Sequence, residues 1–348
     1  MITRSFSIPK RLTHAGLVLP RPRILSAQGQ GVIGDPCIVH DEAIGGLRMF
    51  LFMDPPGHAQ AICRSTSDVG PGQWELVGPL TFTNPQAAVD QTTHKPFVVQ
   101  YADRPNLAAL IQGRYCLVSV AHSPGWVHKY IHRAWSTSLA GPWTWDEETL
   151  IPVGAPDAFD GKHADAVSGF YFPEREEIVY YYMGYPLTAQ ARPHSPYGNA
   201  QGVAVQKLGG PCVTFGEYLA PHPRPGHWAS GWLGGMQILP GREHRWIGLL
   251  NASPTAPDPN SREVFREEPP PSLGGFAWCD EEFPIAHWHF NEEPLCWLDG
   301  IPEAARQAGE GTNLWRHNAL ALDDGRLAIF YNSGFYGREQ LYMLWAES

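Results

Sequence analysis

The stretch Ala134-Trp135-Ser136-Thr137-Ser138-Leu139-Ala140-Gly141-Pro142-Trp143-Thr144-Trp145 carries a pattern that recurs along the chain. It combines a strand that ends in Ala-x-Ser, a Gly/Pro turn, and an aromatic residue that opens the next strand. Weaker copies of this order span residues 61–74, 203–215 and 276–288. Alternating apolar strands separated by Gly/Pro turns, repeated at intervals of some tens of residues, are typical of a β-propeller.

The composition favours the same fold class. The 348 residues include 36 Gly and 33 Pro, and 12% are aromatic while 17% are charged. This balance suits many short strands and tight turns better than long surface helices. We therefore expect an all-β protein in which residues 1–348 form one domain.

The spacing of the repeated pattern predicts a five-bladed β-propeller. The expected blades cover residues 34–82, 91–155, 160–222, 230–296 and 312–348. An additional strand at residues 12–20 has no blade of its own, and the last segment, residues 340–348, ends one strand short. We expect these two segments to pair and close the ring, because closure hides strand edges that otherwise invite aggregation.

The inner strands of a propeller all start around one axis, so polar residues at those starts should meet although they are far apart in sequence. These converging residues are Asp35, His94, Lys95, His163, Asp165, Arg316 and His317.

Two long segments, residues 184–200 and 251–275, have loop composition and interrupt the regular spacing of the strands. Residues 302–308 carry the clearest helical signal.

Charge and patterning argue against several classes of partner. A formal net charge of −10 without any Lys/Arg-rich run disfavours nucleic acid, since phosphate binding needs a basic surface. The first eleven residues lack the apolar run of a secretory signal, and no later segment resembles a membrane span, so we expect no membrane partner and a cytoplasmic location. Six scattered cysteines without CxxC spacing predict reduced thiols.

Three features together resemble the five-bladed glycoside hydrolases of families 43, 32, 68 and 117. They are Gly34-Asp35-Pro36 at the first inner strand, the Ser-x-Ser-Leu-x-Gly-Pro-Trp turn at residues 136–143, and Asp165, 130 residues after Asp35. In the spacing of strands and turns, the resemblance extends over almost the whole chain. It is strongest in the first three blades. It identifies the chain as a divergent member.

The resemblance implies roles for the two aspartates. Asp35 would be the general base or nucleophile, and Asp165 would orient it or bind the sugar. Glycoside hydrolysis needs a second carboxyl group that is kept protonated. Where family 43 has a glutamate, at the opening of the fourth blade, this chain has residues 232–236 with two glycines and no acid.

The identity of the proton donor therefore stays open. Family 117 is thought to use a histidine, so His94, His163 or His317 are alternatives, since imidazole titrates near neutral pH. Glu243 and Glu263 lie in or near turns of the fourth blade and would need an unusual path to the axis.

Other readings of these residues also stay open. Each aspartate could be a turn cap or an ion-pair partner. Lys95 and Arg316 could neutralise the aspartates or hold an anionic group of a substrate. Sugar stacking is possible for Trp126, Trp228 and Trp232, whereas tryptophans at repeated blade positions should be core. No metal ligand set can be read, although the resemblance allows a calcium ion on the axis near His317.

The sequence thus predicts an enzyme that hydrolyses a small glycoside, oligosaccharide or glycoconjugate with Asp35 as general base. His94, Lys95, His163, Trp232 and Arg316 would bind the substrate. The alternatives are a lyase, cyclase or transferase that has lost the acid, or a non-catalytic sugar-binding propeller. No pattern in the sequence predicts the sugar, the linkage, the stereochemistry or the oligomeric state.

Overall fold

The computed structural model describes residues 5–22, 31–54, 57–84, 93–123, 127–187, 199–215, 219, 223–224, 226–254, 272–295, 314–334 and 337–347. These residues form strands, turns and loops and contain no helix, which confirms the predicted all-β class. The predicted helix at residues 302–308 lies outside the described residues, as do Trp126, Glu263 and Cys296. Within these ranges, no helix has the length and apolar character to cross a membrane.

Antiparallel neighbours in sequence build each sheet. The first sheet has the order β2-β3-β4-β5, and the second run has β6, β8, β9 and β10. Their bounds are β2 (Val32–Asp41), β3 (Gly46–Asp54), β4 (Gly57–Cys63), β5 (Glu75–Pro79), β6 (Thr93–Val98), β8 (Tyr115–His122), β9 (Lys129–Ser136) and β10 (Thr144–Trp145).

A third run joins the second through parallel pairs, so that the two together form a nine-stranded sheet. The fourth run is a separate four-stranded sheet with the order β15-β16-β17-β18. The bounds are β7 (Gln100–Tyr101), β11 (His163–Phe172), β12 (Glu177–Tyr185), β13 (Ala200–Lys207), β14 (Cys212–Thr214), β15 (Leu233–Pro240), β16 (Trp246–Ala252), β17 (Leu273–Cys279) and β18 (His289–Phe290).

The last sheet combines both ends of the chain. Its order is β1-β21-β20-β19, in which β1 (Arg11–Leu19) pairs antiparallel with β21 (Gln340–Glu347), beside β20 (Leu327–Ser333) and β19 (Leu314–Ala321). Residues before β1 cross to the sheet that begins with β15, where the Phe6 N–H donates to the carbonyl of Pro240 at 2.9 Å. The N-terminal segment therefore ties this sheet to the last sheet.

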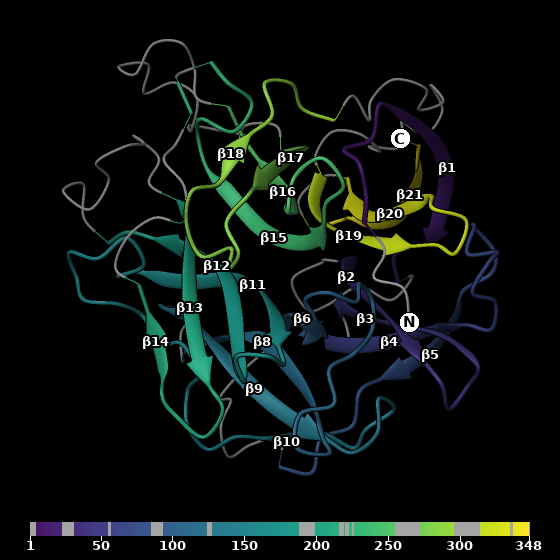
Figure 1. The fold of residues 1–348 in the computed structure, drawn as a ribbon. Helices are drawn as coiled ribbons and strands as arrows, with labels where there is room; N and C mark the ends of the chain where they lie inside the picture. Colours follow the sequence, from purple (N-terminus) through teal and green to yellow (C-terminus); the bar gives the residue numbers. More distant parts are fainter. Residues whose placement is uncertain are drawn as a thin grey trace.

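The first strand of each run lies around a common centre, with the sheets spreading outward (Figure 1). These inner strands contact one another in the cyclic order β2, β6, β11, β15, β19 and back to β2. β2, β11, β15 and β19 are almost completely buried, whereas the first three residues of β6 are partly exposed.

Side-chain hydrogen bonds join inner strands that share no backbone ladder. Gln237 of β15 exchanges two bonds with the backbone of Ala319 in β19, and the Ile38 N–H of β2 donates to Asn318 of β19. Asn106 donates to the carbonyls of Ile38 and Ala319, both at 3.0 Å, and so links β2 and β19 as well. Buried amides of this kind stabilise because each polar group finds a partner.

The repeated sequence pattern lies at the turn from the third to the fourth strand of the first four runs. Residues 134–145 hold the end of β9, the turn and β10, and the weaker copies occupy the β4–β5, β13–β14 and β17–β18 connections. Trp74, Trp143 and Trp288 are buried, which confirms that the repeated tryptophans belong to the core. The packing of these aromatic side chains explains why the pattern recurs.

Asn106→Ala should destabilise the fold, because Asn106 also accepts from the Ala321 N–H at 3.0 Å and adopts a φ of 61° that alanine tolerates poorly. Losing these bonds leaves buried backbone groups unpaired, and we expect a loss of about 3 kcal/mol in the free energy of unfolding. Urea denaturation measures this loss in the free energy of unfolding. The exposed neighbour Asp103→Ala is the control, and an equal effect of both variants would contradict this role.

Candidate functional site

A β-bulge interrupts the start of each inner strand. The register shifts fall between Gly34 and Cys37, His94 and Phe97, Asp165 and Ser168, Leu233 and Met236, and Leu314 and Arg316. A bulge leaves a residue unpaired and redirects its side chain. The polar residues predicted from the sequence therefore lie where the backbone pairing between strands is interrupted.

Three of these bulges hold a non-glycine residue in the left-handed region. Asp35 and Lys95 have φ of 54°, and Ala166 has φ of 51°. The register makes these three residues equivalent on the consecutive inner strands β2, β6 and β11. Such conformations cost energy and concentrate at functional sites, so the centre of the molecule is the place to look for one.

Asp165 is the best-connected group at this centre. Its side chain is fully buried, and its two carboxylate oxygens accept hydrogen bonds from Lys95 Nζ at 2.6 Å and Lys129 Nζ at 2.7 Å. The N–H of Ala166 donates to the same carboxylate at 2.7 Å. The two lysine side chains are each about a fifth exposed, whereas the Asp165 side chain is completely buried.

The charges of this cluster determine its protonation. Burial alone would raise the pKa of Asp165, but Lys129 and Lys95 outweigh it and hold the pKa well below the ordinary value of 3.8. Burial lowers the pKa of Lys95, with Asp165 acting in the opposite direction. Asp165 is therefore a carboxylate at neutral pH and too strongly paired to accept a proton during a reaction.

Asp35 has a different environment. It is 7% exposed, and its backbone N–H donates to Asn332 Oδ1 at 3.3 Å. Gly34 permits this approach, since a Cβ there would lie 2.5 Å from the Asn332 side chain. In the described part of the chain, no group donates a hydrogen bond to its carboxylate. Burial raises the pKa of Asp35, although Lys95 and Arg316 oppose the shift.

Arg316 reaches from β19 across the centre to β11, which is not one of the two neighbours of β19 in the cyclic order. It is 4% exposed and donates through Nη2 to the carbonyl of Val167 in β11, while the buried Nη1 makes no hydrogen bond with the described residues. The charges of Asp35 and Asp165 both act on its guanidinium. The structure thus brings Asp35, Lys95, Asp165 and Arg316 together as the sequence predicted.

The histidines beside this cluster are held neutral. His94 and His122 approach to 3.0 Å between their Nε2 atoms, and burial together with Lys95 and Lys129 keeps the pKa of His94 well below 6.5. His163 accepts the Lys129 N–H through Nδ1 at 3.1 Å, and burial lowers its pKa to about 4. A neutral imidazole can bind a hydroxyl group but cannot serve as a strong acid at pH 7.

Among the described residues, His317 and Trp232 make no hydrogen bond or ion pair with Asp35 or Asp165. His317 alternates with Arg316 on β19 and packs beside the backbone of Leu249 in β16. Burial lowers its pKa to about 3. Trp232 is half-buried directly before β15. Their catalytic and sugar-binding roles stay predictions.

The opening of β15 has no acid, as the sequence indicates. A side chain at Gly234 would overlap with Asn251. Glu243 lies in the turn between β15 and β16, at the opposite end of β15 from Gly234, where it accepts a hydrogen bond from Ser7 at 2.6 Å. Glu243 therefore cannot reach the centre.

Sequence reasoning missed two residues at the centre, Lys129 and Glu339. Lys129 starts β9 opposite His163, and only that pairing brings its ammonium group to Asp165. Glu339 directly precedes β21, is 6% exposed, and interacts electrostatically with Asp35. A lone acidic residue before a strand carries no distinguishing signal in the sequence.

The residues at the centre do not fit a calcium ion. Calcium needs several free oxygen ligands, and both carboxylate oxygens of Asp165 are taken by ammonium groups. In the parts of the chain that the structure describes, no group of three or more His, Cys, Asp and Glu is arranged to hold a metal ion.

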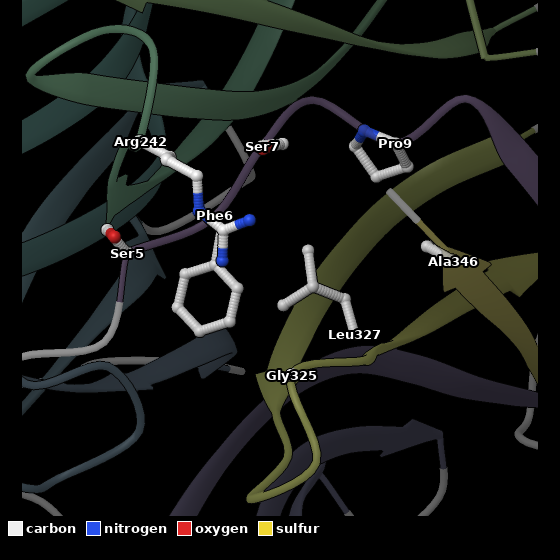
Figure 2. A pocket seen from close by; sticks show the side chains of 8 residues that line it. All are labelled: Ser5, Phe6, Ser7, Pro9, Arg242, Gly325, Leu327 and Ala346. Atoms are coloured by element: carbon white, nitrogen blue, oxygen red, sulfur yellow. The ribbon is translucent and has the colours of Figure 1, made fainter.

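A small surface pocket lies at the opposite end of the inner strands. Phe6, Arg242 and Leu327 line it, between the N-terminal segment and the turns after β15 and β19 (Figure 2). Because Arg242 belongs to the same turn as Glu243, this pocket is remote from Asp35 and Asp165. It takes no part in the candidate site.

The central arrangement combines one buried, ion-paired carboxylate with one buried carboxyl group that accepts no hydrogen bond from the described residues. Such a pair of different environments lets two acids perform different tasks. The surrounding cations and neutral imidazoles supply donors for a polar, hydroxyl-rich ligand.

Solved structures of propeller-type glycoside hydrolases share this fold. One described as a glycoside hydrolase aligns with a TM-score of 0.66 and 11% sequence identity over 98% of this chain and 93% of its own. A thermostable family-43 glycoside hydrolase aligns with a TM-score of 0.54 and 16% identity over 92% of this chain and 91% of its own.

A third structure comes from a study of family 130, a family of mannoside phosphorylases containing hydrolases that target β-1,2 mannosidic linkages in Candida mannan. It aligns with a TM-score of 0.62 and 12% identity over 99% of this chain and 97% of its own. No protein-family model and no curated protein matches the chain. The likeness confirms the predicted resemblance at the level of the fold.

Asp165→Asn should destabilise the protein by about 3–5 kcal/mol at pH 7, because it leaves two lysines without their buried counter-charge. Since the folded-state pKa of Asp165 is depressed, its contribution is present above pH 3.8 and is lost as the pH falls further. The penalty should therefore shrink on acidification.

Urea denaturation at several pH values tests this expectation. Asp146→Asn, which disturbs the more exposed pair with Arg133, is the matched control and should cost less than about 1 kcal/mol. A pH-independent penalty for Asp165→Asn would show that the ion pairs are not its source.

Proposed function

We propose that this protein is a glycoside hydrolase of the five-bladed propeller type that uses Asp35 as its general base. The five runs of strands that begin with β2, β6, β11, β15 and β19 would be the blades of a single domain, and pairing of β1 with β21 would close the ring. The observation that carries the proposal is the unequal pair of buried aspartates, Asp35 and Asp165, beside the centre of this fold.

Asp35 suits the role of base. It is buried, accepts no hydrogen bond from the described residues, and has a raised pKa, so its carboxylate is more basic than an exposed aspartate. In the proposed reaction it removes a proton from the water molecule that attacks the anomeric carbon. Asp165 would act as a positioning residue, because it holds Lys95, whose charge opposes the rise in the pKa of Asp35.

The substrate would be a small glycoside, oligosaccharide or glycoconjugate. The donors at the edge of the site are Lys95, Lys129 and the histidines His94 and His163, which suit sugar hydroxyl groups. Arg316 would contribute through its buried Nη1, which has no partner among the described residues.

Asp35→Asn should abolish hydrolysis while leaving the fold intact, because asparagine fills the same space but cannot accept the proton. We expect kcat/KM to fall about a hundredfold or more, measured on a panel of aryl glycosides.

Asp103→Asn, at an exposed position in the turn before β8, is the control and should retain full activity. Circular dichroism and the melting temperature of both variants establish that they are folded. Full activity in a folded Asp35→Asn variant would rule out Asp35 as the base.

A further inference from the structure

Glu339 lies beside the strand that carries Asp35. Its carbonyl oxygen accepts a hydrogen bond from the Ile33 N–H at 3.1 Å, and the carbonyl of Gly337 accepts from the Gly31 N–H at 3.1 Å. Residues 337–339 therefore run alongside the start of β2, two residues before Asp35. The segment also belongs to the connection between β20 and β21, so the last sheet supplies an acid to the first.

The carboxyl group of Glu339 is buried and incompletely paired. The residue is 6% exposed, and its Oε2 is buried without a hydrogen-bond partner among the described residues. Backbone N–H groups of Glu339, Gly337 and Arg338 act on the carboxyl group and lower its pKa. A buried carboxyl oxygen without a donor favours the protonated form, because that form can donate a hydrogen bond itself.

Other buried acids of the described chain are already engaged. Asp41 pairs with Arg48 at 2.7 Å, and Asp160 accepts from the Tyr182 hydroxyl at 2.7 Å. Asp165 pairs with its two lysines. The buried acids that remain are Asp35 and Glu339.

We propose that Glu339 is the protonated partner of Asp35 and the proton donor of the reaction, an assignment that rests on the proposed function. The carboxyl proton of Glu339 passes to the glycosidic oxygen while the bond from that oxygen to the anomeric carbon breaks. A water molecule forms the new bond to the anomeric carbon and gives its proton to Asp35. The products are the free sugar and the alcohol, and proton exchange with solvent restores both carboxyl groups.

The electrostatics agree with this assignment. Burial and the nearby charge of Asp35 raise the pKa of Glu339 to about 7, against the opposing effect of the backbone N–H groups. A general acid works best when its pKa lies near the working pH. The histidines named as alternatives have pKa values that are too low for this task, as His317 at about 3 illustrates.

Glu339→Gln separates this role from a structural one, because glutamine keeps the shape and loses the proton. With unactivated alkyl or aryl glycosides, kcat/KM should fall about a hundredfold or more. With dinitrophenyl glycosides the loss should be small, since that leaving group departs without protonation. The fall in activity of the parent protein above pH 7 should disappear in the variant.

The matched control is Glu347→Gln, an exposed acid at the other end of β21, which should change neither rate nor pH profile. Equal losses on both kinds of leaving group, with the alkaline limb retained, would overturn the assignment of Glu339.

A measurement without substrate distinguishes this inference from the proposed function. Carbon-13 NMR of side-chain carboxyls should show Glu339 titrating near pH 7 in the parent and at lower pH in Asp35→Asn, because the neighbouring charge is gone. A Glu339 that titrates as an exposed glutamate in both proteins would refute the pair. If the coupling is present but the parent hydrolyses no glycoside, the proposed function fails and Glu339 remains the proton-holding partner of Asp35.

Discussion

The ion pairs of Asp165 with Lys95 and Lys129 are the interaction on which the centre of this molecule depends. A fully buried carboxylate is costly unless charged donors compensate it. Here the two lysines come from β6 and β9, while the carboxylate comes from β11. The pairs therefore fix three strands at one point, and burial together with the two positive charges keeps His94 neutral.

This arrangement requires that the backbone pairing is interrupted where the inner strands begin. If β2, β6 and β11 continued as regular strands to their first residues, the side chains of Asp35, Lys95 and Asp165 would follow the alternation of the pleat. The bulges and the positive φ of Asp35, Lys95 and Ala166 break that alternation where the strands approach the centre. Backbone strain at these positions is the cost of presenting charged groups inside a well-packed core.

The contrast between the three central acids gives the site its chemical character. Asp165 is held ionised by two lysines. Asp35 is buried and only partly compensated by Lys95 and Arg316, and Glu339 has a buried oxygen without a hydrogen-bond partner among the described residues. Environment, and not residue type, separates their pKa values, as acid–base chemistry by two similar groups demands. The polar links among the inner strands, such as Gln237 with Ala319, keep these environments rigid.

The sequence by itself determined the all-β class and the positions at which Asp35, Lys95, Asp165 and Arg316 enter the centre. These follow from local rules: alternating apolar residues make strands, and the Gly/Pro turn at residues 137–143 ends one and starts the next. Tertiary structure alone decided that Lys129 pairs with Asp165, that His317 faces β16, and that Glu339 lies beside Asp35. Glu339 and Asp35 stand about three hundred residues apart, and their proximity arises from the packing of the last sheet against the first, which no local pattern encodes.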